Sequence, residues 1–162
     1  MSLNVELINP FVSASYSVLS MVFSEVPTKG ALTAQPQNTT NNQVNVVIGV
    51  TGDAQGTVIL GMSLITADRI ASAMLNQSVK SFDQLAASAV AELGNMIAGN
   101  ALQILSTNDF DCNIAPPAVI RGTKVEISTL IVPAITISMG LSMGELYLTT
   151  GLSDCRAARR AA

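Results

Sequence analysis

The run FDQLAASAVAELGNMIAGNALQIL, which begins at Phe82, is the feature that most restricts what this chain can fold into. Its spacing of apolar residues predicts a long helix, with the Ser81 hydroxyl as the expected N-terminal cap. On a helical wheel one face collects Ala86, Val90, Leu93, Ile97, Ala101 and Ile104. A helix with such a face must be covered on that side, so the rest of the chain has to supply a second layer.

Strand and turn patterns on both sides of the helix supply that layer. QVNVVIGVTGDAQGTVILGMSL contains two β-branched runs around Gly52 and Asp53, which predicts a β-hairpin. After the long helix come four strand-like runs separated by Gly or Pro, namely CNIA, VEISTLIV, AITISMGL and ELYLTTGL. Most of the second half is therefore expected to form antiparallel sheet.

Two further helices complete the expected fold. Asn9-Pro10 opens a helical pattern over residues 10–23, and Thr66 is expected to cap a short helix in ADRIASAMLNQ. The polar stretch 28–43 is typical of an exposed connector or a ragged edge, and it is the segment that we most expect to be flexible. Because 162 residues suffice for one well-cored domain, we expect a single domain over residues 1–162. Its class is α+β, with two long helices and a short helix packed on a largely antiparallel β-sheet.

Composition excludes several classes of function. The chain has no His, which removes His-based catalytic triads and zinc sites of the HExxH type. No cluster of Cys and carboxylates has ligand spacing, so we expect no metal site. The net charge of −3 gives no positive field that would hold a nucleic acid. Three arginines after Cys155 make residues 153–162 a basic tail, which we expect to be a solvated helix.

The sequence also favours a cytoplasmic protein. The chain opens MSLNVELINPF, with no Lys or Arg before Lys29, which does not fit a secretion signal. The apolar window 130–141 is interrupted by Pro and hydroxyl residues and is shorter than the roughly 20 residues that a membrane span needs. Cys112 and Cys155 lie 43 residues apart in no ligand spacing, so we expect two reduced thiols.

Glu92 and Asn95 raise the question of function, because a carboxylate and an amide stand in an otherwise apolar helix. Together with Ser88 and Gly99 they fall on the side opposite the apolar face, and their Cβ atoms are expected about 5 to 6 Å apart. Such a set can simply be a solvated helix face. Gly94 and Gly99, however, each cost a helix about 0.5 to 1 kcal/mol relative to Ala, which favours close approach of a partner. Glu92 and Asn95 are therefore the candidate site, with Ser88, Gly94 and Gly99 as supporting surface.

The segment ELGNMIAGNA resembles the ExxNMxxGN signature of the CheC/CheX/FliY family of chemotaxis phosphatases. These enzymes remove phosphate from the aspartyl phosphate of the response regulator CheY. ELINPFVSA, VTGDAQGTVILGMS, IASAMLNQ and PAVIRG resemble CheX segments in the same order, so the resemblance covers residues 5–152. Some members carry a second Glu/Asn pair on an earlier helix. Since NPFVSASYSVLSMVF has no such pair, the resemblance implies one site, as in CheX.

The resemblance implies a phosphatase that acts on a CheY-like receiver domain without a cofactor of its own. The receiver brings the acyl phosphate, Mg²⁺ and a Lys, so hydrolysis lacks only a water molecule held in line with the phosphorus. An amide donates and accepts hydrogen bonds at once, so Asn95 is expected to position that water. Glu92 is expected to bind the receiver's Lys, and a general-base role stays open for it.

Two other functions fit the same surface less fully. A non-catalytic receiver-binding or flagellar switch module would keep the surface without turnover, and a structural oligomerisation unit would bind no receiver. The runs AITISMGL and ELYLTTGL carry few charges and are expected to leave unpaired strand edges, a hazard that pairing between subunits removes. We therefore expect a homodimer, which the resemblance also implies.

Overall fold

The long helix predicted after residue 81 is α3 (Gln84–Thr107) in a computed structural model of the protein that describes residues 3–35, 41–129, 131 and 133–162. Its cap is Asp83 rather than Ser81, because the Asp83 carboxylate accepts a 2.8 Å hydrogen bond from the backbone N–H of Ala86. Ser81 lies in the loop, where its carbonyl accepts from the N–H of Asp83. The apolar face predicted from the helical wheel is buried except at Ile104, which is half-buried. Its buried members are Ala86, Val90, Leu93, Ile97 and Ala101.

The first helix, α1 (Val5–Phe23), begins five residues before Pro10, where the sequence pattern placed its start. The cap is Asn4, whose side chain accepts a hydrogen bond from the N–H of Glu6. Pro10 lies inside the helix and is buried. The Asn9-Pro10 pair was therefore the wrong start, because the earlier Asn4 side chain already accepts from a free N–H group of the first turn. The longer helix also contains Glu6 and Asn9, both exposed, so the expectation that this helix lacks a Glu-x-x-Asn spacing is wrong.

The short helix, α2 (Leu64–Leu75), is capped by Ser63 and not by Thr66. The N–H of Thr66 donates to Ser63 Oγ at 3.1 Å, so Thr66 lies in the first turn of the helix. Ser63 comes directly after a strand of the hairpin, and the chain therefore passes from strand to helix with no intervening loop.

Within the described residues seven strands form one sheet, and every neighbouring pair is antiparallel. In spatial order the strands are β1 (Thr28–Gln35), β6 (Ala134–Leu141), β7 (Gly144–Asp154), β3 (Ala54–Met62), β2 (Val44–Gly52) and β4 (Cys112–Ile114), and β5 (Ala118–Arg121) also pairs with β2. The predicted hairpin is β2–β3, whose turn contains Gly52 at a φ of +111°, a conformation that favours glycine. The expected α+β class with an antiparallel sheet is confirmed.

Of the two alternatives for the polar stretch 28–43, a connector or a ragged edge, the structure supports an edge for residues 28–35. Residues 28–35 form β1, which pairs with β6 at one edge of the sheet. Residues 36–40 of the stretch lie outside the described residues. The polar composition is misleading here because a strand pairs through its backbone, and the side chains of residues 28–34 are all exposed.

The predicted strand VEISTLIV is also wrong where the structure describes it, since residues 125–129 and 131 form no strand. Leu130 and Val132 lie outside the described residues. The strand in this part of the chain is β5, which pairs with β2. Strand-like composition therefore was not sufficient, because a strand also needs a neighbouring edge with which to pair, and β4 and β5 occupy the outer edge of β2.

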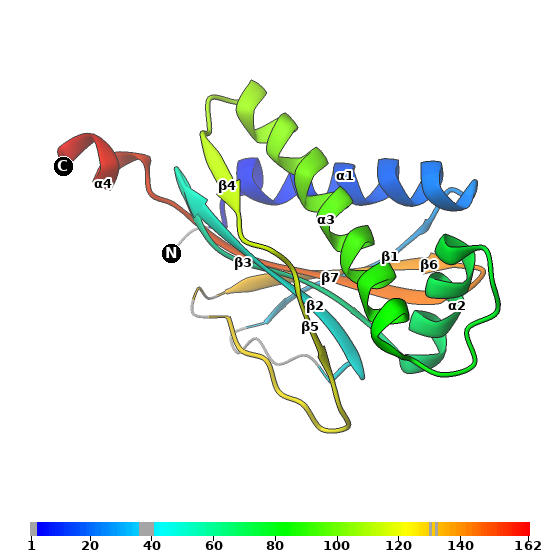
Figure 1. Ribbon diagram of the computed structural model, residues 1–162. Helices are drawn as coiled ribbons and strands as arrows, with labels where there is room; N and C mark the ends of the chain where they lie inside the picture. Colours follow the sequence, from blue (N-terminus) through cyan, green and yellow to red (C-terminus); the bar gives the residue numbers. More distant parts are fainter. Residues whose placement is uncertain (1–2, 36–40, 130, 132) are drawn as a thin grey trace.

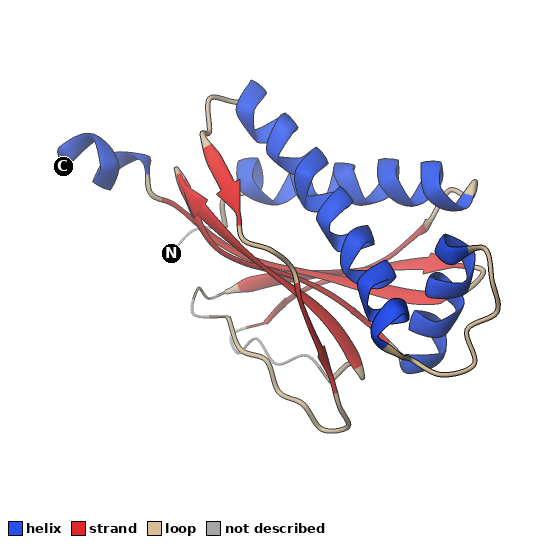
Figure 2. Ribbon diagram, viewed as in Figure 1, coloured by secondary structure: helices blue, strands red, loops and turns tan. Residues whose placement is uncertain are grey.

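The three longer helices lie together on one face of the sheet, and the core fills the space between them and the strands (Figures 1 and 2). On β2 every second side chain belongs to this core, as the period of a strand requires, namely Val44, Val46, Ile48 and Val50. α3 packs against α1 and α2 and crosses β2, β4 and β5. One side of α3 is thus fixed in the core, and its opposite side forms the outer surface of the protein.

The basic tail forms the helix that the sequence predicts, and none of its residues is buried, but specific contacts also attach it to the body of the protein. It forms α4 (Arg156–Ala161) after the last strand. The guanidinium carbon of Arg156 lies 3.7 Å from the centre of the Phe110 ring, just beyond the end of α3. Arg159 Nη1 donates to Asp53 Oδ1 at 2.8 Å, at the turn of the β2–β3 hairpin. Two of its three arginines are thus held by specific contacts.

Candidate functional site

The outer face of α3 carries the residues that the sequence singled out. Ser88 and Glu92 are exposed, and Asn95 and Gly99 are half-buried. Leu93, on the opposite side of the helix, has no exposed surface. The pair of Glu92 and Asn95 therefore stands on a rigid element whose position is set by core packing, which is a precise way to place functional groups.

Within the described part of the chain, the side chains of Glu92 and Asn95 have no hydrogen-bond or ion-pair partner. The carboxylate can accept hydrogen bonds from a cationic group, and the amide offers both an N–H donor and a carbonyl acceptor. Binding of an outside group to either side chain therefore displaces no described interaction.

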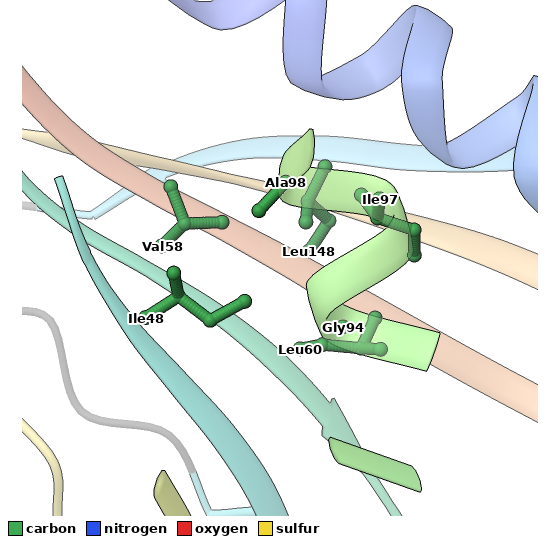
Figure 3. A pocket seen from close by; sticks show the side chains of 7 residues that line it. All are labelled: Ile48, Val58, Leu60, Gly94, Ile97, Ala98 and Leu148. Atoms are coloured by element: carbon green, nitrogen blue, oxygen red, sulfur yellow. The ribbon is translucent and has the colours of Figure 1, made fainter. Parts of the chain in front are cut away.

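Gly94 is not part of the outer surface, where the sequence prediction placed it. It is buried against β2, and a Cβ added at this position would lie 2.8 Å from Val46 Cγ1. Figure 3 shows Gly94 at a small apolar cavity, whose lining also includes Ile48 and Leu148. The glycine is thus explained by the close approach of α3 to the sheet, and not by the approach of a partner.

Gly99 fits the predicted supporting surface, because an added Cβ there would meet nothing within 4 Å. The neighbouring Asn100 carries a second amide on α3. Its side chain is exposed, and its Nδ2 donates to the carbonyl of Met96 at 2.9 Å. Asn100 is thus committed to its own helix, whereas Asn95 is available to a partner.

The two thiols lie on other elements. Cys112 is on β4, Cys155 follows β7, and both are free. Burial raises the pKa of the Cys112 thiol, which keeps it protonated and poorly nucleophilic at neutral pH. Among the described residues, no three His, Cys, Asp or Glu side chains are grouped as a metal site. What the outer face of α3 offers is a carboxylate that can bind a cation and an amide that can orient a polar molecule.

Leu85 belongs to the same face but was not identified from the sequence. It is 52% exposed, although it is a large apolar residue, and it stands seven residues before Glu92. Seven residues are close to two helical turns, so Leu85 and Glu92 point the same way. The helical wheel contained this information, since Leu85 lies off the apolar face.

The sequence matches the family model of the chemotaxis phosphatase CheX over residues 44–139. It is 29% identical over 128 residues to the CheY-P phosphatase CheX of Thermotoga maritima, a match that covers 78% of this chain and 83% of that protein. The segment matched by the family model includes the hairpin, α2 and all of α3, and hence Glu92 and Asn95.

Solved structures share the fold. The crystal structure of a chemotaxis protein CheX from Desulfovibrio desulfuricans superposes with a TM-score of 0.82 at 29% identity, over 92% of this chain and 99% of that one. A chain of the CheX–CheY–BeF₃–Mg²⁺ complex from Borrelia burgdorferi superposes with a TM-score of 0.77 at 29% identity, over 90% of this chain and 96% of that one.

Proposed function

The chain belongs to the chemotaxis phosphatase CheX family, and from that premise we propose that it hydrolyses the aspartyl phosphate of a CheY-like response regulator. The family model covers more than half of the chain, so the family and the phosphatase class expected from the sequence are confirmed. The proposed substrate is supported by the Thermotoga maritima relative, which is named a CheY-P phosphatase, and by the Borrelia burgdorferi complex, which contains CheY. The observation that carries the proposal is the exposed pair of Glu92 and Asn95 within the matched segment.

Asn95 positions the attacking water in the proposed mechanism. Its carbonyl accepts a hydrogen bond from the water and its N–H₂ group donates one, which aligns the water oxygen with the phosphorus. The water oxygen then forms a bond to phosphorus while the bond from phosphorus to the aspartyl oxygen breaks, and the carboxylate of the receiver leaves. An acyl phosphate is already reactive, so positioning is the main contribution that this chain has to make.

Glu92 binds the active-site Lys of the receiver in this scheme. A charge-assisted hydrogen bond between a carboxylate and an ammonium group anchors α3 on the receiver and fixes the place of Asn95, one helical turn away. We favour this role over that of a general base because the carboxylate is exposed and needs only a cationic partner to complete its contacts.

The Mg²⁺ ion of the reaction belongs to the receiver, and the chain contributes no cofactor of its own. The outer face of α3 has a single carboxylate near its amide, whereas a protein site for a divalent cation needs several oxygen ligands. Elemental analysis of the purified protein tests this point, and a stoichiometric, tightly bound metal would contradict it.

A dephosphorylation assay with phosphorylated CheY-like receivers tests the proposed activity. Substoichiometric protein should release phosphate from an excess of receiver, and turnover should require Mg²⁺. Binding of the phosphorylated receiver without release of phosphate would instead support a non-catalytic receiver-binding or flagellar switch module. The absence of binding would leave only a structural oligomerisation unit.

The proposed homodimer rests on a different strand from those named by the sequence. β6 and β7 have neighbours on both sides, so neither is an edge. β1 is the edge strand next to β6, its described side chains are exposed, and Leu32 is 59% exposed. We propose that β1 pairs with a second copy, because such pairing would satisfy its outer backbone groups. A monomer mass from light scattering at tens of micromolar would contradict this proposal.

A cytoplasmic location without membrane or nucleic-acid contact completes the proposal. By length and composition α1 would reach across a bilayer, as core helices of many soluble proteins would. Its side chains Leu7, Phe11 and Leu19 are fully buried in this fold, so insertion of α1 into lipid would require the core to open. Fractionation of cells that express the full chain tests the location.

A further inference from the structure

A hollow lies between the end of α2 and the beginning of α3. Its volume is about 260 Å³, and its lining includes Leu75, Val79 and Leu85 together with polar residues of the loop between the two helices. The lining is thus mixed, with apolar side chains from the end of α2, the connecting loop and the start of α3 beside polar ones. A surface that combines apolar and polar side chains is typical of interfaces between proteins.

The loop that forms the hollow is held in place by hydrogen bonds. The N–H of Val79 donates to Ser72 Oγ at 2.9 Å, which ties the loop to the last turns of α2. Arg121 Nη1 donates to the carbonyl of Phe82 at 3.0 Å, and Phe82 itself is almost fully buried. The hollow is therefore largely pre-formed, and binding there costs little ordering of the loop.

The hollow is continuous with the candidate site. Leu85 belongs both to its lining and to the face of α3 that carries Glu92. Seven residues of helix place Leu85 about 10 Å from Glu92 along the axis. A standard interface covers about 800 Å² on each partner, which corresponds to a disc with a radius of roughly 16 Å. A receiver centred on Glu92 and Asn95 would therefore also cover Leu85.

We propose that Leu85 and this hollow form a second contact with the receiver, in which an apolar side chain of the receiver packs against Leu85, Leu75 and Val79. The inference rests on the proposed function and adds the part of the surface that sets affinity. A receiver is favoured over a second copy of this chain because β1, the edge proposed for the dimer, lies at the far end of the sheet from the strands under α3.

The division of work between the two contacts follows from their chemistry. Asn95 touches the reacting water and acts on the rate of hydrolysis, whereas Leu85 touches only the surface of the receiver. Truncation of an apolar side chain loses the favourable burial of its surface in an interface, and a charged replacement would in addition have to lose its water. Changes at Leu85 should therefore raise KM and Kd and leave kcat unchanged.

The test uses Leu85→Ala and Leu85→Asp in the full chain. Asp suits the first turn of a helix, so the second variant should fold, and circular dichroism with urea unfolding checks this. The binding probe is a CheY-like receiver activated with Mg²⁺ and beryllofluoride, which mimics the phosphoryl group. For Leu85→Asp we expect Kd and KM to rise at least about tenfold, because a carboxylate would be desolvated in an apolar contact, with kcat within about twofold of the parent.

Val5→Ala is the matched control. Val5 is 57% exposed in the first turn of α1. The next residue, Glu6, lies 3.9 Å from Arg156, which stacks on Phe110 beyond the other end of α3. Val5 is thus far from the hollow, and its truncation should leave Kd, KM and kcat unchanged.

The outcomes separate this inference from the proposed function. Unchanged KM and Kd in Leu85→Asp, together with loss of turnover in Asn95→Ala, would overturn the second contact alone. A raised Kd in Leu85→Asp with a receiver that is bound but never hydrolysed would support the contact and overturn the phosphatase proposal. Conversion of a dimer to a monomer by Leu85→Asp would assign the hollow to a second copy of the chain and overturn the inference.

Discussion

The two long helices of this protein, α1 and α3, pack against each other on the same face of the sheet, yet they expose different chemistry. Beyond Pro10 the exposed side of α1 carries Ser13, Ser17 and Met21, whereas the outer side of α3 carries Glu92 and the half-buried Asn95. The first turns of α1 also expose a carboxylate and an amide, on Glu6 and Asn9, but Glu6 lies 3.9 Å from Arg156 of the tail. Burial of the inner face stabilises each helix, and this burial places no requirement on the outer residues. The proposed function of α3 therefore depends on a few side chains that contribute little to the fold.

The largest effect on stability is expected from a substitution on the buried inner face of α3. Leu93→Ala removes a fully buried side chain next to the candidate pair and should lower the free energy of unfolding by about 2 to 5 kcal/mol. Leu19→Ala, equally buried on α1, should fall in the same range. Urea unfolding measures both. Loss of activity in a Leu93→Ala variant that remains folded would contradict the division between the two faces of α3.

Asn95→Ala should have the next largest effect, and on turnover alone. Without the amide that orients the water, the rate of phosphate release should fall about 100-fold or more, a typical effect of deleting one positioning group. The free energy of unfolding should stay within about 0.5 kcal/mol of the parent, because no described interaction is lost. Ser17→Ala on α1 is the matched control. An Asn95→Ala variant that turns over receiver like the parent would refute the mechanism.

Glu92→Ala distinguishes the two proposed roles, which are binding of the receiver by Glu92 and positioning of the water by Asn95. Binding of the beryllofluoride-activated receiver should persist in Asn95→Ala but weaken in Glu92→Ala, where the contact with the receiver's Lys is lost. A charge-assisted hydrogen bond contributes about 1.5 to 3 kcal/mol, so we expect the Kd to rise about tenfold or more. Equal receiver binding in the two variants would contradict the separate roles.

Sequence reasoning succeeded where a local pattern determines the structure. The period of α3 identified its inner face, and Gly52 with Asp53 identified the hairpin turn, because both depend on residues close in the chain. The polar strand β1 could not be predicted, since its pairing depends on the distant strand β6. For the same reason AVIR, and not the more strand-like VEISTLIV, forms a strand beside β2.

The candidate site shows the same limit at the scale of single residues. The wheel correctly separated Glu92 from Leu93, but the presence of Gly94 was attributed to the outer surface although its wheel position lies within the buried face. Its actual neighbour, Val46, belongs to a strand that is remote in sequence. Helical spacing therefore gives the direction of a side chain, but the element that it meets comes from the tertiary fold.

Substitution of each of the two glycines of α3 by Ala should change the free energy of unfolding in opposite directions. Gly94→Ala would bring a methyl group into Val46, and overpacking of this kind should cost about 1 to 3 kcal/mol of stability. Gly99→Ala meets nothing within 4 Å and should stabilise the protein by about 0.5 to 1 kcal/mol, because Ala is the better helix former. Thermal and urea unfolding measure the stability of the two variants. A gain of stability in both would contradict the assignment of Gly94 to the inner face.

The smallest effect is expected at the tail, which connects the ends of the two helices. Arg156 lies 3.9 Å from Glu6 on α1, stacks on Phe110 beyond α3, and forms a 2.7 Å ion pair with Asp154. The Arg156 guanidinium lowers the pKa of the Asp154 carboxyl below its usual value. A pKa lowered by folding stabilises the native state above the unfolded-state value of about 4 and stops doing so as the pH falls through the native value.

Asp154→Asn should therefore be less stable than the parent at pH 7, by up to about 1 kcal/mol, because the pair is near the surface. The difference should shrink as the pH falls below about 4, since protonation removes the same charge from the parent. Urea unfolding at a series of pH values measures the difference directly. If it stayed constant down to pH 2, the ion pair would not be its source, and the stacking of Arg156 on Phe110 would be the main attachment of the tail.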